Sequence, residues 1–235
     1  MNSHTSKEYD ELMARAHKLV VQMGERVRRQ VEDAVESLAS GSPTLINQIL
    51  GHELVINSLE RSIDELAGQI IARRQPTARD LRFVLAVVGV TTDLERIGDE
   101  AKKIALQARK IFADGMSAQP RTVEVRRMAT IVQDMLRQAI AALETLDPRA
   151  AVALARRDEE SDLVFQGMLR QLISFMIEDP RTISSCLDFL FVAKSLERIG
   201  DHARNVSEHV VYASTGKDVR HATLQEIEKE LRTAG

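Results

Sequence analysis

The sequence LERIGD occurs twice in this chain, at residues 94–99 and again at residues 196–201. The two copies of this motif lie 102 residues apart. A similar offset, 105 residues, separates the pair Ser42-Pro43 from the pair Asp147-Pro148. An identical run of six residues has a much lower chance frequency than most short motifs. We therefore interpret the chain as two copies of one structural unit.

Apolar residues recur throughout both copies with the spacing of amphipathic helices. The stripes cover residues 45–70, 83–111 and 189–213, and helical bundles bury stripes of this kind against one another. Proline is tolerated in the first turn of a helix and blocks continuation of the preceding helix. The helix starts are therefore expected at Ser42-Pro43, Gln75-Pro76, Asp147-Pro148 and Asp179-Pro180. The pattern predicts six long helices and a short charged segment, at about 5–39, 44–73, 77–112, 120–146, 149–178, 181–214 and 222–233.

The composition favours an all-α protein. Aromatic residues make up only 3% of the chain, which has 11 Gly and 5 Pro, whereas β-sandwiches and barrels need more turn residues and more aromatic or β-branched positions. We expect two tandem three-helix bundles related by internal duplication. The units are expected at residues 1–115 and 116–216, divided at the break between Gly115 and Pro120, with a charged C-terminal tail at 217–235 that contains the short segment.

Several classes of protein are disfavoured. No apolar run approaches the roughly 18–20 residues that span a bilayer, and the polar N-terminal stretch MNSHTSKEYDEL does not resemble a signal peptide. The single cysteine, Cys186, excludes an intrachain disulfide and fits a reducing compartment, so a cytoplasmic protein is expected. The net charge of −3 gives no basic field, and nucleic acid is not an expected partner.

Acidic residues within the repeat form the strongest candidate site. Glu95 and Asp99, like Glu197 and Asp201, are four residues apart and share a helix face. The preceding helices carry matching pairs at the 105-residue offset, Glu53 with Asn57 and Asp158 with Asp162. If these helices are antiparallel neighbours, four oxygen-bearing side chains converge in each unit. Such a set suits magnesium, manganese, calcium or iron.

Simpler explanations remain open for the same residues. Arg198 and Arg204 are three residues from Asp201, and Asp99 has similar basic neighbours, so helical salt bridges account equally well for the charges. Gly98 and Gly200 indicate either a close approach of helices or room for a ligand. His202 follows Asp201, but its counterpart in the first copy is Glu100, which favours a solvated or partner-facing role.

The chain resembles the PhoU family over residues 7–214. The resemblance is carried by the duplicated motif with His202 after its second copy, by Arg74-Gln75-Pro76 before the first copy and by Glu178-Asp179-Pro180-Arg181 before the second. This resemblance implies two tandem three-helix bundles that form a homodimer. It also implies an accessory protein of the phosphate ABC transporter that negatively regulates the phosphate-starvation two-component system. Some members bind iron, zinc or other metals through acidic pairs spaced four apart.

The resemblance implies a divalent or trivalent metal, which could be iron, zinc, manganese or magnesium. Its implied ligands, assigned by their positions in the motif, lie in both units. They are Glu53, Asn57, Glu95 and Asp99 in the first unit and Asp158, Asp162, Glu197 and Asp201 in the second. Asn57 departs from the acidic pattern and removes one charge, so the first site should hold metal more weakly.

Three functions are therefore weighed. The first is a regulator, peripheral to the membrane, that docks on the phosphate transporter and a sensor histidine kinase. The second is a helical scaffold without a regulatory role. The third is a carboxylate-bridged metalloenzyme, but no histidine stands three residues after a glutamate as the ferritin-like version requires. We expect a protein that is not an enzyme.

Overall fold

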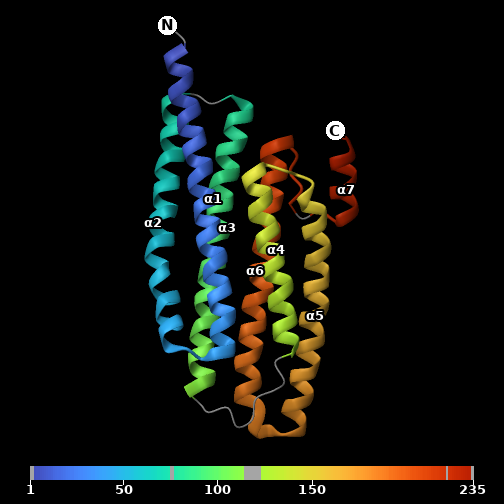
Figure 1. Ribbon diagram of the computed structural model, residues 1–235. Helices are drawn as coiled ribbons and strands as arrows, with labels where there is room; N and C mark the ends of the chain where they lie inside the picture. The colour runs from blue at the N-terminus through green and yellow to red at the C-terminus, as the bar shows by residue number, and fades with distance from the viewer. Residues whose placement is uncertain (1–2, 75–76, 114–122, 221, 234–235) are drawn as a thin grey trace.

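The computed structural model describes residues 3–74, 77–113, 123–220 and 222–233, and these residues form an all-helical protein (Figure 1). The α-helices are α1 (Ser3–Ser40), α2 (Pro43–Arg74), α3 (Ala78–Ala113), α4 (Val123–Thr145), α5 (Ala150–Glu178), α6 (Ile183–Thr215) and α7 (Leu224–Thr233). A 3-10 turn, Pro180–Thr182, joins α5 to α6. The all-α prediction is confirmed, while the break at 115–120 and the pair Gln75-Pro76 lie outside the described residues.

Local chemistry explains where the helices end. Pro43 is the first residue of α2, and Gly41 before it adopts φ +62° beneath the ring of Phe112, where a Cβ would lie 2.4 Å from a ring carbon. Only glycine fits there, because other residues rarely adopt positive φ and any side chain would collide with the ring. At the other hairpin, Asp179 accepts a hydrogen bond from the backbone N–H of Arg181, with Pro180 in the first turn.

The helices form two groups of three, α1–α3 and α4–α6, which pack side by side (Figure 1). The third helix of each group, α3 or α6, lies at the junction, and it packs more extensively against its counterpart than against either other helix of its own group. α3 and α6 run antiparallel, since Asp93 contacts His202 whereas Lys110, further along α3, contacts Asp188. The main apolar core is continuous across this junction and includes Leu94 and Leu196. Both motif helices are thus packed at the centre of the molecule.

The C-terminal segment folds back on the second group. α7 begins with a capping box, in which the backbone N–H of Thr223 donates to Glu226 and the backbone N–H of Glu226 donates to the Thr223 hydroxyl. Ile227 is fully buried in a small cluster with Ala151, Ala155 and Val211. The short charged segment expected at 222–233 is therefore a packed helix. Among the described helices, none combines the length and apolar character that crossing a bilayer requires.

Candidate functional site

The first acidic cluster lies between α2 and α3. Glu53 and Asn57 from α2, and Glu95 and Asp99 from α3, line one small cavity of about 10 Å³. This is room for about one water molecule. The structure therefore brings together the four side chains that the repeat singled out in this unit.

Two further polar groups border this cavity, one from α3 itself and one from α1. The ammonium of Lys102, one turn after the motif, forms an ion pair with Glu53. The side-chain oxygen of Gln30 from α1 is buried and has no hydrogen-bond partner among the described residues. Burial, together with the nearby charges of Asp99 and Glu60, raises the pKa of Glu95 above its usual value. The carboxylates thus repel one another, and Lys102 neutralises only one of them directly.

The second acidic cluster lies between α5 and α6 and has greater mutual repulsion. Burial raises the pKa of Asp201 to about 6, with added repulsion from Glu197 and Asp158. The pKa of Asp162 is likewise raised by burial and by the charges of Asp158 and Glu197. All four predicted carboxylates of this unit therefore interact electrostatically.

Basic side chains compensate part of the second cluster. Arg204 donates to the buried Asp158 at 3.0 Å and to Glu208 at 3.0 Å, and it also donates to the carbonyl oxygen of Ala222 just before α7. Lys194 contacts Glu197 at 2.6 Å. Arg204 thus links the acidic cluster to the C-terminal segment.

Each cluster contains an ion pair, and the two ion pairs occupy equivalent positions of the repeat. Lys102 pairs with Glu53 in the first unit, and Arg204, 102 residues later, pairs with Asp158, 105 residues after Glu53. Salt bridges do form within these clusters, as expected, but between other residues than the sequence spacing indicated. Among the described residues, Arg198 and Arg204 pair with Glu100 and Asp158 rather than with Asp201.

Whether these clusters hold a metal stays a prediction. Carboxylate and amide oxygens are the donors that hard cations prefer. However, no group of three or more His, Cys, Asp or Glu side chains in the described parts of the chain is arranged to hold a metal ion. The carboxylates would have to reorient around an ion, because Lys102 and Arg204 now engage one in each cluster.

The glycines of the motif differ in their surroundings. A Cβ on Gly98 would lie 3.2 Å from the Gln30 oxygen and 3.2 Å from Ile56, so three helices approach closely at this point. A Cβ on Gly200 would meet Met135 and Val132 at 3.7 Å, which is ordinary packing distance. Close helix approach therefore explains Gly98 but not Gly200.

A buried polar network at the α3–α6 junction was not predicted from the sequence. Asp93 is 8% exposed and accepts hydrogen bonds from His202 Nδ1 at 2.8 Å, His209 Nε2 at 3.2 Å and Asn205 at 3.2 Å. Burial alone would raise the pKa of Asp93, but these hydrogen bonds outweigh it and hold the pKa at about 2. Because an ionised carboxylate can only accept, both imidazoles donate to it.

The prediction that His202 is solvated or faces a partner protein is wrong, because His202 faces the other half of its own chain. The repeat held a signal for this contact. Asp93 and Ser195 occupy equivalent positions, as do Glu100 and His202, and Ser195 hydrogen-bonds to Glu100 on the opposite side of the junction. Polar residues recurring on the motif helices, away from the acidic pairs, mark the face where the two copies meet.

Comparison with known proteins identifies relatives that extend over nearly the whole chain. The PhoU domain matches residues 20–108 and 125–210, one match in each unit, which confirms the tandem arrangement. The phosphate-specific transport system accessory protein PhoU homolog of Pseudomonas aeruginosa is 40% identical over 232 residues, covering 98% of this chain and 95% of that protein. The corresponding Escherichia coli (strain K12) protein, named PhoU, is 36% identical over 231 residues, with 98% and 95% covered.

Solved structures agree with the fold. The crystal structure of PhoU from Pseudomonas aeruginosa superposes with a TM-score of 0.85 at 40% identity, covering 89% of this chain and 100% of that one. The phosphate transport system regulatory protein PhoU from Streptococcus pneumoniae gives a TM-score of 0.82 at 24% identity, covering 90% and 99%. At that lower identity the likeness concerns the fold alone.

Proposed function

Because this chain belongs to the PhoU family, we propose that it is an accessory protein of the phosphate-specific transport system that also represses the phosphate-starvation response. The observation that carries this proposal is the near-complete coverage of this chain by relatives named as accessory proteins of that system. The family consists of accessory and regulatory proteins rather than enzymes, which argues against a carboxylate-bridged metalloenzyme.

In the proposed mechanism the protein binds the phosphate ABC transporter and a sensor histidine kinase from the cytoplasmic side, as a homodimer peripheral to the membrane. Binding biases the kinase away from signalling only if the protein prefers one state of its partners over the other. The continuous core across α3 and α6 supports this role, since it packs the two units against each other and a partner can contact both at once. A scaffold without such a preference would bind both states equally and would not regulate.

Metal binding is a separate part of the proposal. A divalent or trivalent ion would be held in the second unit by Asp162, Glu197 and Asp201, joined by Asp158 when Arg204 releases it. Its positive charge would offset both the burial and the repulsion from Glu197 and Asp158 that together raise the pKa of Asp201 to about 6. In the first unit Glu53, Asn57, Glu95 and Asp99 would bind more weakly, because Asn57 contributes no charge.

The regulatory role is tested by deleting the gene and measuring phosphate-starvation genes in phosphate-rich medium. These genes should stay on in the deletion strain and return to repression when the intact gene is restored. Normal repression in the deletion strain would refute the proposal. Capture of the tagged protein from membranes at high and low phosphate identifies the partners, and sedimentation equilibrium measures whether the protein is a dimer.

The metal proposal is tested by elemental analysis of protein purified without chelator. The double variant Asp158→Asn/Asp201→Asn should lose the metal of the second unit, whereas the matched variant Glu53→Gln/Asp99→Asn should lose a smaller amount. Equal metal content in the wild type and both variants would eliminate these ligands. The regulatory proposal would be unaffected, since it rests on the deletion phenotype.

A further inference from the structure

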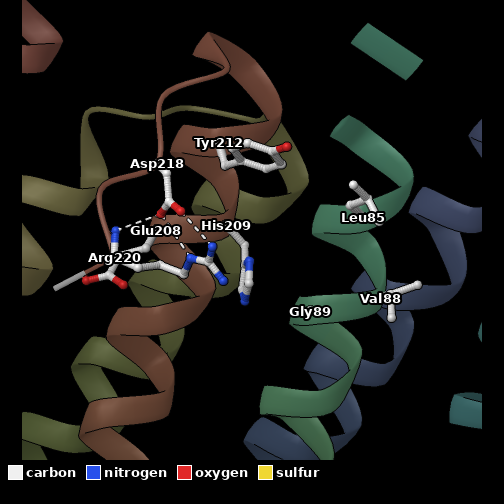
Figure 2. A pocket seen from close by; sticks show the side chains of 8 residues that line it. All are labelled: Leu85, Val88, Gly89, Glu208, His209, Tyr212, Asp218 and Arg220. Carbon is white, nitrogen blue, oxygen red and sulfur yellow. Dashed lines mark hydrogen bonds and ion pairs between the residues drawn. The ribbon is translucent and has the colours of Figure 1, made fainter. Parts of the chain in front are cut away.

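A pocket of about 350 Å³ opens at one end of the junction between α3 and α6 (Figure 2). Its α3 wall is apolar and consists of Leu85, Val88 and Gly89. Tyr212 of α6 lies opposite Leu85 and adds an aromatic ring to the lining. The volume is at the lower end of the range of ligand sites, so one large side chain can enter the pocket.

The repeat places a glycine and an exposed phenylalanine at equivalent positions. Gly89 of α3 forms part of the pocket, and the residue 102 positions later is Phe191 of α6. The imidazole of His209 lies directly on the α3 backbone at Gly89, where a Cβ would be 2.4 Å from a ring carbon. Phe191 is 54% exposed, although phenylalanine is among the residues most often buried. The first unit therefore has a hollow where the second unit has a protruding ring.

The pocket and Phe191 lie on one face of the molecule. Phe191 and His209 are 18 residues apart on α6, which is five helical turns, so they share a helix face at a separation of about 27 Å. Leu85 beside the pocket and Leu187 beside Phe191 are equivalent positions of the repeat, and both are exposed. No described helix therefore covers either end of this face.

Two copies of this face are complementary to each other. Gly89 and Phe191 each precede the glycine of their own motif by nine residues, and α3 and α6 are antiparallel. The hollow and the ring are thus equally far from the centre of the face, where Arg198 contacts Glu100. A two-fold axis through this centre, in the plane of the face and perpendicular to the helices, places Phe191 of each copy over the hollow of the other.

We propose that the outward face of α3 and α6 is the interface of a homodimer, in which Phe191 of each copy enters the pocket of the other. This inference rests on the homodimer of the proposed function and names its contact surface. Two buried rings, one at each end, are the kind of central apolar anchor that contributes most of the binding energy of an interface.

The lining of the pocket suits an aromatic ring. The ring packs on the apolar wall around Leu85 and forms an aromatic pair with Tyr212. Arg220 lines the polar wall and the guanidinium of Arg82 lies nearby, at Gly216, so cations are available to the face of the ring. The two carboxylates of the polar wall are already hydrogen-bonded to arginines, so the ring displaces water without leaving them unpaired.

The middle of the face carries charges of both signs. Arg96 and Arg198, at equivalent positions of the motif, are exposed there, and the partly exposed Glu95 and Glu197 precede them. Each copy therefore offers cations and carboxylates near the two-fold axis, so ion pairs between copies can form in place of repulsion. A polar region between apolar anchors is consistent with the composition of ordinary protein interfaces.

The test is sedimentation equilibrium of the full chain, comparing the wild type with Phe191→Ala and Leu85→Glu. Each variant should raise the dimer dissociation constant about 100-fold or more, because a homodimer of either variant loses both ring-in-pocket contacts. Leu163→Ala and Leu54→Glu are the matched controls, since both side chains are exposed on other helices, α5 and α2. Both controls should associate like the wild type.

Mixing the two variants gives a result that misfolding cannot produce. Phe191→Ala keeps its pocket and Leu85→Glu keeps its ring, so a mixed dimer regains one of the two contacts, whereas neither variant alone has any. An equimolar mixture should therefore contain more dimer than either variant at the same total concentration.

Two outcomes would overturn the inference, and they differ in what they leave standing. If Phe191→Ala dimerises as tightly as the wild type, or if the mixture contains no more dimer than its components, the interface is wrong but the homodimer stands. If the wild type is monomeric at every concentration measured, the homodimer and its interface are both wrong. The regulatory role is unaffected in either case, since the deletion strain tests it separately.

Discussion

Asp93 and Asp201 are aspartates on the two motif helices whose surroundings move their pKa values in opposite directions. Burial would raise the pKa of both. At Asp93 three hydrogen-bond donors stabilise the charged form and hold the pKa at about 2, whereas at Asp201 the neighbouring carboxylates add to burial and raise the pKa to about 6. The difference lies in what faces each carboxyl group, not in its position along the helix.

Stability should therefore depend on pH through Asp201. Because its pKa is higher in the folded chain than the usual 3.8, the folded state binds a proton more tightly, and stability falls as the pH rises from about 4 to about 6. After allowing for solvent screening, the loss is of the order of 1 kcal/mol. Urea unfolding of the metal-free protein at intervals between pH 4 and pH 7 measures it.

Asp201→Asn should flatten this dependence and stabilise the protein at pH 7. The exposed Asp64 of α2 provides the control, since Asp64→Asn should leave the profile unchanged. Asp93 does not interfere, because its lowered pKa contributes stability that is lost only as the pH falls from about 4 towards about 2. A profile of Asp201→Asn that matches the wild type between pH 4 and pH 6 would contradict the assignment.

The motif glycines should also respond differently to alanine. Gly200→Ala is expected to stabilise the protein by about 0.5–1 kcal/mol, because alanine favours the helix and the new methyl meets its neighbours at 3.7 Å. Gly98→Ala should be neutral or destabilising, since the Gln30 oxygen and Ile56 at 3.2 Å must move. Urea unfolding compares the two, and equal gains at both positions would show that the close approach at Gly98 has no energetic effect.

The convergence of the acidic side chains could be predicted from the sequence, because it follows from the helical spacing and the duplication alone. The four-residue spacing places Glu95 with Asp99 on one helix face, and the duplication identifies the matching positions on the preceding helix. The contacts of Asp93 with His202 and His209 could not be derived in this way. They join residues more than 100 positions apart in the chain. The recurring polar positions mark the face where the two copies meet, but they do not specify which residues pair across it.

At the scale of elements, helix boundaries were predicted well where the chain provides a physical stop. Pro43 opens α2, and Asp179 caps the turn that contains Pro180 before α6. Apolar periodicity then determined the helix lengths. The docking site of α7 was not predictable. Its apolar residues Leu224, Ile227 and Leu231 have helical spacing and indicate an apolar face, but they do not specify which helices that face packs against.

The stability of α7 should depend more on its packing against the rest of the chain than that of any other described helix. At 10 residues it is too short to be stable alone in water, and it depends on the burial of Ile227 and on ion pairs such as Arg156–Glu228 at 2.6 Å. Ile227→Ala is expected to cost about 2–4 kcal/mol locally and to release α7, so amide exchange in residues 224–233 should accelerate while α1–α3 keep their protection. Gln225→Ala, on the exposed side of α7, is the control, and unchanged exchange in Ile227→Ala would show that other contacts suffice.

At the scale of the whole molecule, the duplication produces a junction rather than two separate bundles. α3 and α6 each contribute apolar residues to one continuous core, and polar contacts recur on both sides of its centre, with Asp93 holding His202 and Ser195 bonding to Glu100. Each copy thus completes the core of the other. Two domains joined by a linker would instead have two separate cores and a more polar interface.

This arrangement predicts that the chain unfolds in one cooperative step. Separating the two units would expose the apolar face shared by α3 and α6 and leave Asp93 charged without its three donors, so a state with one unit folded is unfavourable. Calorimetry should show one transition whose calorimetric and van't Hoff enthalpies agree. Asp93→Ala should lower the stability by about 2–4 kcal/mol and shift that transition as a whole. Two resolved transitions in the wild type, or a shift confined to one part of the signal in Asp93→Ala, would mean that the units fold separately and that the junction is an interface between domains.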